Sequence, residues 1–349
     1  MSELQIKCVV WDLDDTLWAG TLLEDPKVTL KPRVPDIIRE LDGRGILHSI
    51  ASRNEYAHAM DQLKSFGLHE YFLYPEIGWD AKSICIQRIA ENLNIGYDTV
   101  LFVDDQPFER DEVASVHGDV WCLDSSRYLD LPDHPRLKPR YVTRDSVMRR
   151  TMYQDDVRRQ KDEETFVGPQ ESFLRELNMV MEISEAREED LLRAEELTYR
   201  TNQLNATGET HTVESLNDIR LRDNHKILVC ELADRYGSYG KIGLALLEFG
   251  STAWRLKLLL FSCRVMAKGV GTVFMSQLRN AAKERGVQLM ADFRDTGRNR
   301  MMYITYAFAG FSEKAKQDDG MVLLENQLTD IPPCPDYLET NVNVDWSSL

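Results

Sequence analysis

Two carboxylates stand two residues apart directly after an apolar segment near the start of the chain. Residues 8–11 have the length and composition of a strand, and Asp12 and Asp14 follow them. In an open α/β sheet the carboxyl ends of the strands share one edge, where such folds place their chemistry. The spacing therefore predicts Asp12 as a nucleophile with Asp14 as a neighbouring acid/base. Acidic residues also decorate strand ends without any function, so this pair needs support from the rest of the chain.

Polar residues at later positions supply that support. Ser52 follows the apolar segment 46–51, and its hydroxyl can hold a phosphate oxygen. Lys82 begins a helical pattern and can neutralise charge on a transferring phosphoryl group. Asp104 and Asp105 follow another apolar segment and offer the hard oxygen atoms that Mg²⁺ prefers. Each of these residues alone could be an ordinary surface side chain, but their order favours a phosphoryl-transfer site. We accordingly predict Mg²⁺ as the cofactor, with ligands drawn from Asp12, Asp14, Asp104 and Asp105.

Strands and helices that would position these residues alternate along the first part of the chain. Apolar segments of strand length occur at 8–11, 46–51, 100–103 and 120–123. Apolar residues recur at i, i+3, i+4 and i+7 over 34–41 and again over 86–93, which is the period of an amphipathic helix. This alternation predicts an α/β fold with a Rossmann-like parallel sheet that carries helices on both faces.

The spacing of the predicted site residues also bears on access to the site. Asp12 and Ser52 are separated by 39 residues, and Ser52 and Lys82 by 29. Each interval is barely long enough for the connecting helix and strand, which leaves no room for a cap domain. We therefore expect an open site that large partners can reach, such as a carrier protein presenting a phosphorylated group.

A proline-rich stretch and a highly charged stretch separate this pattern from a second one. We predict residues 1–125 as the first domain, 126–165 as a linker with a surface helix, and 166–349 as the second domain. The second domain shows a strand, a helix, three strands, a glycine turn, a helix, a strand and a helix. Apart from the helix after the turn, these predicted elements span 179–183, 188–200, 227–232, 241–249, 254–262, 268–271, 288–293 and a helix that ends at 309.

A cysteine is the candidate nucleophile of the second domain. Cys263 follows the predicted strand 254–262 and precedes Arg264, and a thiol beside a cation near a helix N-terminus can become a nucleophile. A lone cysteine is more often a small buried residue. Cys8 is the next candidate thiol, although its apolar surroundings favour a place in the core.

Two loops of the second domain are candidates for substrate or carrier binding. Asn202 and Asn205 lie in a polar loop, 201–208, where they either cap turns or hydrogen-bond a substrate. Gly269 and Gly271 lie between a predicted strand and a predicted helix, where backbone N–H groups could bind the phosphate of a carrier arm. A Gly-x-Gly pair on its own is usually only a turn.

Charge and cysteine usage exclude several classes of partner. With 42 Lys+Arg against 58 Asp+Glu, the net charge of −16 disfavours nucleic acid and anionic lipid. The N-terminus has no signal-like segment, and no apolar run reaches the roughly 18 to 20 residues that span a bilayer. The six cysteines show no metal-type spacing, which indicates reduced thiols in a cytoplasmic protein.

The first domain resembles the haloacid dehalogenase superfamily over residues 5–125, with its four motifs matched in order by Asp12, Ser52, Lys82 and Asp104. The resemblance implies a capless phosphatase domain in which Asp12 forms an aspartyl-phosphate. Asp14 would protonate the leaving oxygen and later activate water, while Ser52 and Lys82 stabilise the phosphoryl oxygens. Asp104, with Asp105 as the second candidate, would help Asp12 hold Mg²⁺.

The second domain resembles the acyl-CoA-dependent N-acetyltransferase fold. That fold would present a thioester at the end of the strand 254–262, beside Cys263. Met266 stands where the fold usually carries Arg or Gln, which disfavours coenzyme A and leaves a pantetheine arm as the expected ligand.

Nearly the whole chain resembles the FkbH-like glyceryltransferase/phosphatase family. The resemblance rests on the motifs at 7–14, 20–25, 102–107, 262–264 and 291–294. It implies that the enzyme transfers the glyceryl group of 1,3-bisphosphoglycerate, through a cysteine, to the phosphopantetheine thiol of an acyl carrier protein. It also implies removal of the remaining phosphate, which gives a precursor of polyketide units such as methoxymalonyl. The alternatives are a small-molecule phosphatase with a carrier- or partner-binding second domain, and a scaffold with a vestigial first domain.

Overall fold

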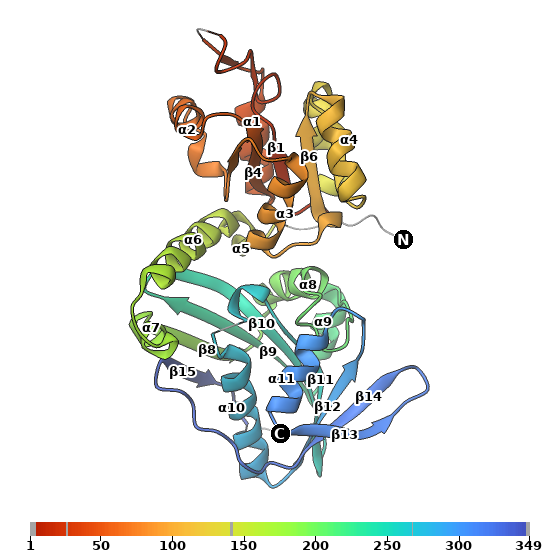
Figure 1. The fold of residues 1–349 in the computed structure, drawn as a ribbon. Coiled ribbons are helices and arrows are strands. Elements are labelled where there is room, and N and C mark those ends of the chain that lie inside the picture. The colour runs from red at the N-terminus through yellow and green to blue at the C-terminus, as the bar shows by residue number, and fades with distance from the viewer. Residues whose placement is uncertain (1–4, 26, 140–141, 267, 347–349) are drawn as a thin grey trace. The chain divides into compact units, whose positions relative to one another are not determined.

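The chain folds into two compact units, each with its own sheet (Figure 1). The computed structural model describes residues 5–25, 27–139, 142–266 and 268–346. The units comprise Met1–Asp156 and Val157–Leu349. Their boundary falls inside helix α6 (Arg149–Thr165), within the stretch 126–165 that the sequence predicts as a linker.

A five-stranded parallel sheet forms the centre of the first unit. Its order is β5-β4-β1-β6-β7, and every neighbouring pair is parallel. The strands span Cys8–Trp11 (β1), Leu47–Arg53 (β4), Glu76–Gly78 (β5), Val100–Asp104 (β6) and Trp121–Asp124 (β7). Because the strands are parallel, their carboxyl ends all lie at one edge of the sheet.

Helices cover both faces of this sheet because the central strand is apolar on both sides. Val9 and Trp11 pack into the cluster that includes α1 (Val34–Gly43) and α2 (Tyr56–Ser65). Cys8 and Val10 pack into the opposite cluster with α3 (Lys82–Leu93) and α4 (Pro107–Val116). The successive side chains of a strand point to opposite faces, so a strand buried on both sides must be apolar throughout.

Short elements complete the first unit. Between β1 and α1 lies a small antiparallel pair, β2 (Trp18–Ala19) and β3 (Thr29–Leu30). After β7 come two 3-10 helices, Ser125–Asp133 and Pro135–Leu137, and then α5 (Arg144–Val147). Apart from α1, β4, α2 and β5, the described residues between β1 and α3 form only short elements and connections, as expected for a site without a cap domain.

An eight-stranded mixed sheet forms the centre of the second unit, in the order β13-β14-β12-β11-β10-β9-β8-β15. The strands span Met179–Glu185 (β8), His225–Asp234 (β9), Gly237–Phe249 (β10), Ala253–Phe261 (β11), Gln288–Arg294 (β12), Phe311–Lys316 (β13), Met321–Asn326 (β14) and Leu338–Asn343 (β15). The helices are α7 (Gln170–Glu176), α8 (Leu191–Arg200), α9 (Val213–Arg220), α10 (Val270–Arg285) and α11 (Arg300–Phe308).

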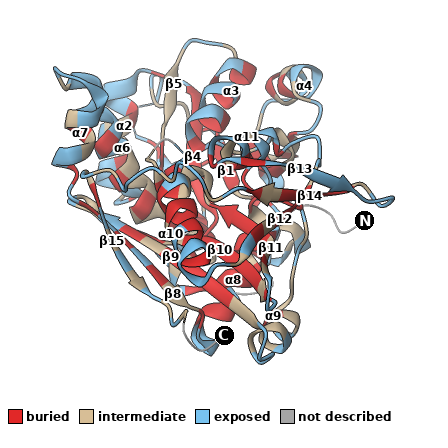
Figure 2. Cartoon of the chain, turned by 90° about the horizontal axis from the view of Figure 1, so that it is seen from below, coloured by how far each residue is buried: buried red, intermediate tan, exposed pale blue. Residues whose placement is uncertain are grey.

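Each face of this second sheet is covered by a different group of helices. Residues of α7, α10 and α11 pack with one set of strand side chains, and residues of α8 and α9 pack with the other. Figure 2 shows the buried residues concentrated on the strands and on the helix faces turned towards them. The predicted α/β fold class is confirmed, with a parallel Rossmann-like sheet followed by a mixed α/β unit. Among the described helices, none has both the length and the apolar character needed to cross a lipid bilayer.

Candidate active site

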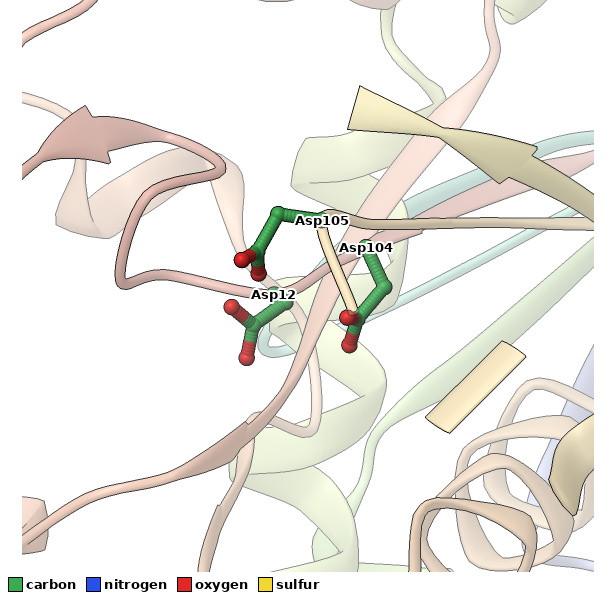
Figure 3. A group of neighbouring side chains, drawn as sticks. All are labelled: Asp12, Asp104 and Asp105. Atoms are coloured by element: carbon green, nitrogen blue, oxygen red, sulfur yellow. The ribbon is translucent and has the colours of Figure 1, made fainter. Parts of the chain in front are cut away.

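Three carboxylates meet at the carboxyl edge of the first sheet. β1 and β6 are neighbours, with Trp11 opposite Val103, so Asp12 and Asp104 leave the sheet side by side. Asp12, Asp104 and Asp105 each bring an oxygen within 4.8 Å of the other two (Figure 3). The structure therefore gathers three of the four carboxylates that the sequence predicts as metal ligands.

Lys82, the first residue of α3, reaches into this group of carboxylates. Its Nζ lies 2.5 Å from Asp12 Oδ1 and 3.0 Å from Asp104 Oδ2. It also donates a hydrogen bond to the Ala51 carbonyl at 2.7 Å, and its side chain is almost fully buried. Burial favours the neutral amine, but the two carboxylates raise the pKa of Lys82 and hold the ammonium form. The predicted cation thus touches the predicted nucleophile.

The ionisation of Asp12 is set by burial and by its charged neighbours. Burial raises the pKa of Asp12 to about 6, and Asp104 adds to the rise. Lys82 and a hydrogen bond with Ser52 act in the opposite direction. Ser52 is itself buried near the end of β4, so the predicted phosphate-binding hydroxyl lies at the predicted nucleophile.

Asp14 is held by three donors and stands outside the group of three carboxylates. Its Oδ1 accepts hydrogen bonds from Trp18 Nε1 at 2.8 Å and from the Leu22 N–H at 3.0 Å. Its Oδ2 accepts from Asn54 Nδ2 at 2.9 Å. These bonds fix the carboxylate beside Asp12, which suits an acid/base. The predicted role of Asp14 as a metal ligand finds no support in its side chain, because Asp14 is not part of the group of carboxylates that could hold a metal ion.

The group formed by Asp12, Asp104 and Asp105 fits a hard divalent cation. Three carboxylates facing one lysine leave an excess of negative charge in a largely buried site. Burial and the charge of Asp104 also raise the pKa of Asp105, whereas the charge of Lys31 acts in the opposite direction. Carboxylate oxygens are the donors that Mg²⁺ prefers, so these residues fit the predicted cofactor.

Thr16 and Glu112 also support the site, although the sequence analysis did not single them out. The buried Thr16 hydroxyl accepts from the Asp105 N–H at 3.1 Å and donates to Asp105 Oδ1 at 3.4 Å. Glu112 of α4 accepts from the Ser83 N–H at 3.0 Å and from the Ser83 hydroxyl, so it caps the helix that begins with Lys82. The sequence offers one signal for Thr16, because it stands only two residues after the predicted acid/base Asp14. Asn54 stands at the same spacing after Ser52. Glu112 had no such signal.

The structure separates the two candidate thiols by their surroundings. Cys263 is half-buried, takes part in no disulfide and begins a 3-10 turn after β11. The neighbouring Arg264 donates a hydrogen bond from Nη2 to the Tyr239 carbonyl at 2.9 Å. Cys8 is fully buried in β1, and burial raises the pKa of its thiol far above the ordinary value, so it is a core residue. Of the two thiols, Cys263 is therefore the better placed to act as a nucleophile.

The glycine turn before α10 has the backbone form that glycine favours. Gly269 adopts a φ of +75° immediately before the helix. A Cβ at this position would lie 2.7 Å from the Tyr337 hydroxyl, which shows how closely that side chain lies against the turn. Gly271 lies in the first turn of α10, where a Cβ would make only ordinary contacts.

The two predicted binding residues of the polar loop 201–208 differ in their exposure to solvent. Asn202 is exposed, whereas Asn205 is 1% exposed. Asn205 Oδ1 accepts from the N–H groups of Thr207 and Gly208, and its Nδ2 donates to the Glu209 carbonyl. The side chain therefore shapes its own loop, and the predicted binding role of Asn205 has no support in the structure.

Comparisons with known proteins find partial similarities. No protein-family model matches it. Human magnesium-dependent phosphatase 1 is 29% identical over 119 residues, which cover 29% of this chain and 68% of that protein.

Solved structures give likenesses of both kinds. The N-terminal part of the Bacteroides fragilis protein BF1531, a phosphatase domain complexed with Mg, is 26% identical with a TM-score of 0.34. That match covers 37% of this chain and 39% of the other, so this chain spans less than half of the Bacteroides chain. The Escherichia coli ribosomal-protein-S18-alanine N-acetyltransferase is 16% identical with a TM-score of 0.33, over 42% of this chain and 92% of that one.

Proposed function

We propose that the first unit is a Mg²⁺-dependent phosphatase in which Asp12 is the nucleophile. The observation that carries the proposal is the contact of Lys82 with both Asp12 and Asp104. This contact places a cation where charge on a phosphoryl group would develop. The partial similarity to human magnesium-dependent phosphatase 1 supports the same activity and the same metal.

The proposed reaction proceeds through an aspartyl-phosphate. A carboxylate oxygen of Asp12 forms a bond to phosphorus while the bond to the leaving oxygen breaks, and Asp14 gives that oxygen a proton. Asp14 then takes a proton from water as the water oxygen attacks phosphorus, which releases inorganic phosphate and restores Asp12. Lys82 and Ser52 hold the phosphoryl oxygens in both steps. Mg²⁺, when bound, supplies positive charge that offsets the charge on those oxygens.

For the whole chain, we propose that this dephosphorylation accompanies glyceryl transfer. The Cys263 thiolate would attack the carbonyl carbon of the acyl phosphate in 1,3-bisphosphoglycerate, and inorganic phosphate would leave. The phosphopantetheine thiol of an acyl carrier protein would then take the glyceryl group from Cys263, and the first unit would remove the remaining phosphate. The half-buried position of Cys263 after β11 and the resemblance to the FkbH-like family support this assignment. Nucleic acid and membranes have no part in it.

Intact-mass spectrometry of both proteins tests the two activities together. The full chain is incubated with Mg²⁺, 1,3-bisphosphoglycerate and a pantetheinylated carrier protein. Wild type should give a glyceryl-carrier without phosphate, Asp12→Asn a phosphoglyceryl-carrier, and Cys263→Ala an unloaded carrier. Cys334→Ala, which removes an exposed thiol, is the matched control and should behave as wild type.

Two outcomes would change the proposal. If Cys263→Ala still loads the carrier, the assignment of Cys263 is wrong. If neither protein gains mass while a simple phosphate ester is still hydrolysed, the transferase assignment fails. A small-molecule phosphatase with a carrier- or partner-binding second unit then becomes the better account.

A further inference from the structure

The sheet of the second unit opens where β11 and β12 part. The two strands pair in parallel register only over 253–256 and 288–291. β11 continues to Phe261 and β12 continues to Arg294, beyond this paired region. Two parting strands expose backbone donors and acceptors to each other across a gap, and an extended chain that carries amides can pair with such an edge. The acyl-CoA-dependent fold that this unit resembles would present its thioester at this end of β11.

The gap is filled by a segment of the protein itself. The Ala206 N–H donates to the Leu259 carbonyl of β11 at 2.9 Å, and the Ala206 carbonyl accepts from the Arg294 N–H of β12 at 3.0 Å. The Phe261 N–H donates to the Leu204 carbonyl at 3.0 Å. Ala206 thus bridges the two strands, and residues 204–206 occupy the edge of β11 that a bound arm would need.

Side-chain contacts hold this segment in place. Residues 204–207 are all buried, and Leu204 and Ala206 belong to the main apolar cluster of the unit. The fully buried Asn299 donates from Nδ2 to the carbonyls of Asn205 and Ala206, and also to the carbonyl of Arg294. The segment is therefore built into the core as a short strand would be.

The turn before α10 is also occupied by the protein. Tyr337 lies against Gly269 so closely that a Cβ there would be 2.7 Å from its hydroxyl. This turn is where a phosphate of coenzyme A or of a carrier arm was expected, at the N-terminus of the helix. Two separate parts of the expected ligand path thus contain the chain's own residues.

We propose that residues 204–206 are a permanent strand segment that closes the gap between β11 and β12. The second unit therefore takes neither coenzyme A nor a pantetheine arm into this gap, and an acyl group reaches Cys263 by a path outside it. This inference does not depend on the phosphatase activity of the first unit. It restricts the route of the proposed acyl transfer without requiring that the transfer occurs.

Hydrogen exchange of the full-length protein tests whether the segment is seated. The amides of Ala206, Phe261 and Arg294 should be protected to a degree similar to those of Leu258 and Leu260, which belong to the paired region of β10 and β11. Rapid exchange at Ala206 and Phe261 while Leu258 and Leu260 remain protected would overturn the proposal.

Ligand titration and a matched pair of variants complete the test. Coenzyme A and acetyl-coenzyme A should leave the protection of Ala206 and Phe261 unchanged, and a loss of protection at Ala206 on titration would overturn the proposal.

Ala206→Pro removes the N–H that bonds Leu259 and should speed exchange at Phe261 and Arg294 by about tenfold. Ala206→Gly keeps both backbone groups and serves as the control. Equal exchange in the two variants would contradict the bridging role, and the wild-type measurements decide the matter if Ala206→Pro does not fold. Carrier loading through Cys263, measured separately, distinguishes failure of this inference from failure of the proposed transfer.

Discussion

Asp14 can act as an acid/base only if its carboxylate is held in one orientation, and Asn54 is one of the groups that hold it. Its amide donates to Asp14 Oδ2 at 2.9 Å from a buried position after β4. We expect Asn54→Ala to slow the hydrolysis of alkyl phosphates by about ten- to a hundredfold, because loss of proper acid/base placement forfeits part of the usual catalytic gain. With p-nitrophenyl phosphate, the rate of the first step, formation of the aspartyl-phosphate, should fall less, because the leaving group needs no proton.

The ratio of the two rates separates this role from a general loss of folding. Steady-state rates with both substrates, and the amount of phosphorylated Asp12 trapped by acid, measure it directly. Gln62→Ala, which removes a half-buried side chain of α2 that donates to the Ser65 hydroxyl, is the control and should match wild type. An equal fall with both substrates and no change in trapped phosphate would show that Asn54 has only a structural role.

His48 should make the stability of the first unit depend on pH. It is fully buried, accepts from Trp11 Nε1 at 3.0 Å and has its Nε2 3.1 Å from the Ile38 carbonyl, which together fit a single neutral tautomer. Burial lowers the pKa of His48 to about 3. As pH falls below the unfolded value of about 6.5, the unfolded state takes up a proton that the folded state does not, so stability is lost.

This loss gives a prediction for the variant His48→Gln, which keeps a donor and an acceptor but does not titrate. Between pH 7.5 and pH 5, wild type should lose about 2 kcal/mol more unfolding free energy than the variant. Urea unfolding of the first unit at both pH values measures the difference. Equal losses of unfolding free energy in wild type and His48→Gln would show that His48 is not the group responsible for the pH dependence.

Sequence reasoning found the residues that stand at the ends of elements and missed those that reach the site from loops. Asp12, Ser52 and Asp104 lie at the carboxyl ends of apolar strands, and Lys82 begins an amphipathic helix, so local patterns placed them. Trp18 reaches Asp14 from a two-residue strand whose position depends on the fold of the whole loop. No local pattern encodes such a contact.

At the scale of elements, the start of α3 decides where Lys82 lies, and Glu112 of α4 fixes that start. Its carboxylate accepts from both the N–H and the hydroxyl of Ser83, the residue after Lys82. We expect Glu112→Ala to destabilise the first unit by about 1 kcal/mol, the usual effect of removing a helix cap. Phosphatase activity should fall as well, because Lys82 loses its fixed starting point.

Asp111→Ala is the matched control, because Asp111 is an exposed carboxylate on the same helix. Thermal unfolding and hydrolysis rates of both variants make the comparison. If the two variants have the same activity and stability, the cap contributes nothing to the position of Lys82.

Most helices and strands are predictable from the regular spacing of their apolar residues. Elements that lack such a spacing were missed. α1 buries Val34, Ile37, Ile38 and Leu41 as its apolar spacing predicts, and α3 buries its own apolar face. β15 was not predicted because its residues after Leu338 are mostly polar and exposed or half-buried, so the strand carries little apolar signal. The segment 204–206 was read only as a polar loop, since a few residues cannot show a period. Its place between two strands follows from tertiary pairing alone.

At the scale of the whole molecule, the two units have separate apolar cores, so we expect two unfolding transitions. Mg²⁺ at about 100 times its Kd should stabilise the first unit by about 2.7 kcal/mol and leave the second unchanged. Removal of Mg²⁺ by a chelator should reverse this gain and abolish phosphate-ester hydrolysis.

Calorimetry with and without the metal measures both transitions. Asp104→Asn should weaken the Mg²⁺ effect, whereas Asp98→Asn, away from the three carboxylates, should preserve it. An equal Mg²⁺ response in wild type and Asp104→Asn would show that the metal binds elsewhere.

The pairing of β15 with β8 has a consequence for the order in which the protein acquires its structure during synthesis. All five strands of the first sheet are present once residue 124 has left the ribosome. The second sheet has β15 at one edge, where residues 338–343 lie in parallel register against 179–185. β8 must therefore wait with one edge uncovered until residues 338–343 have been made, because its neighbour lies about 160 residues later in the chain. The first unit is thus expected to complete its sheet on the nascent chain well before the second unit, whose sheet is complete only once β15 has been made.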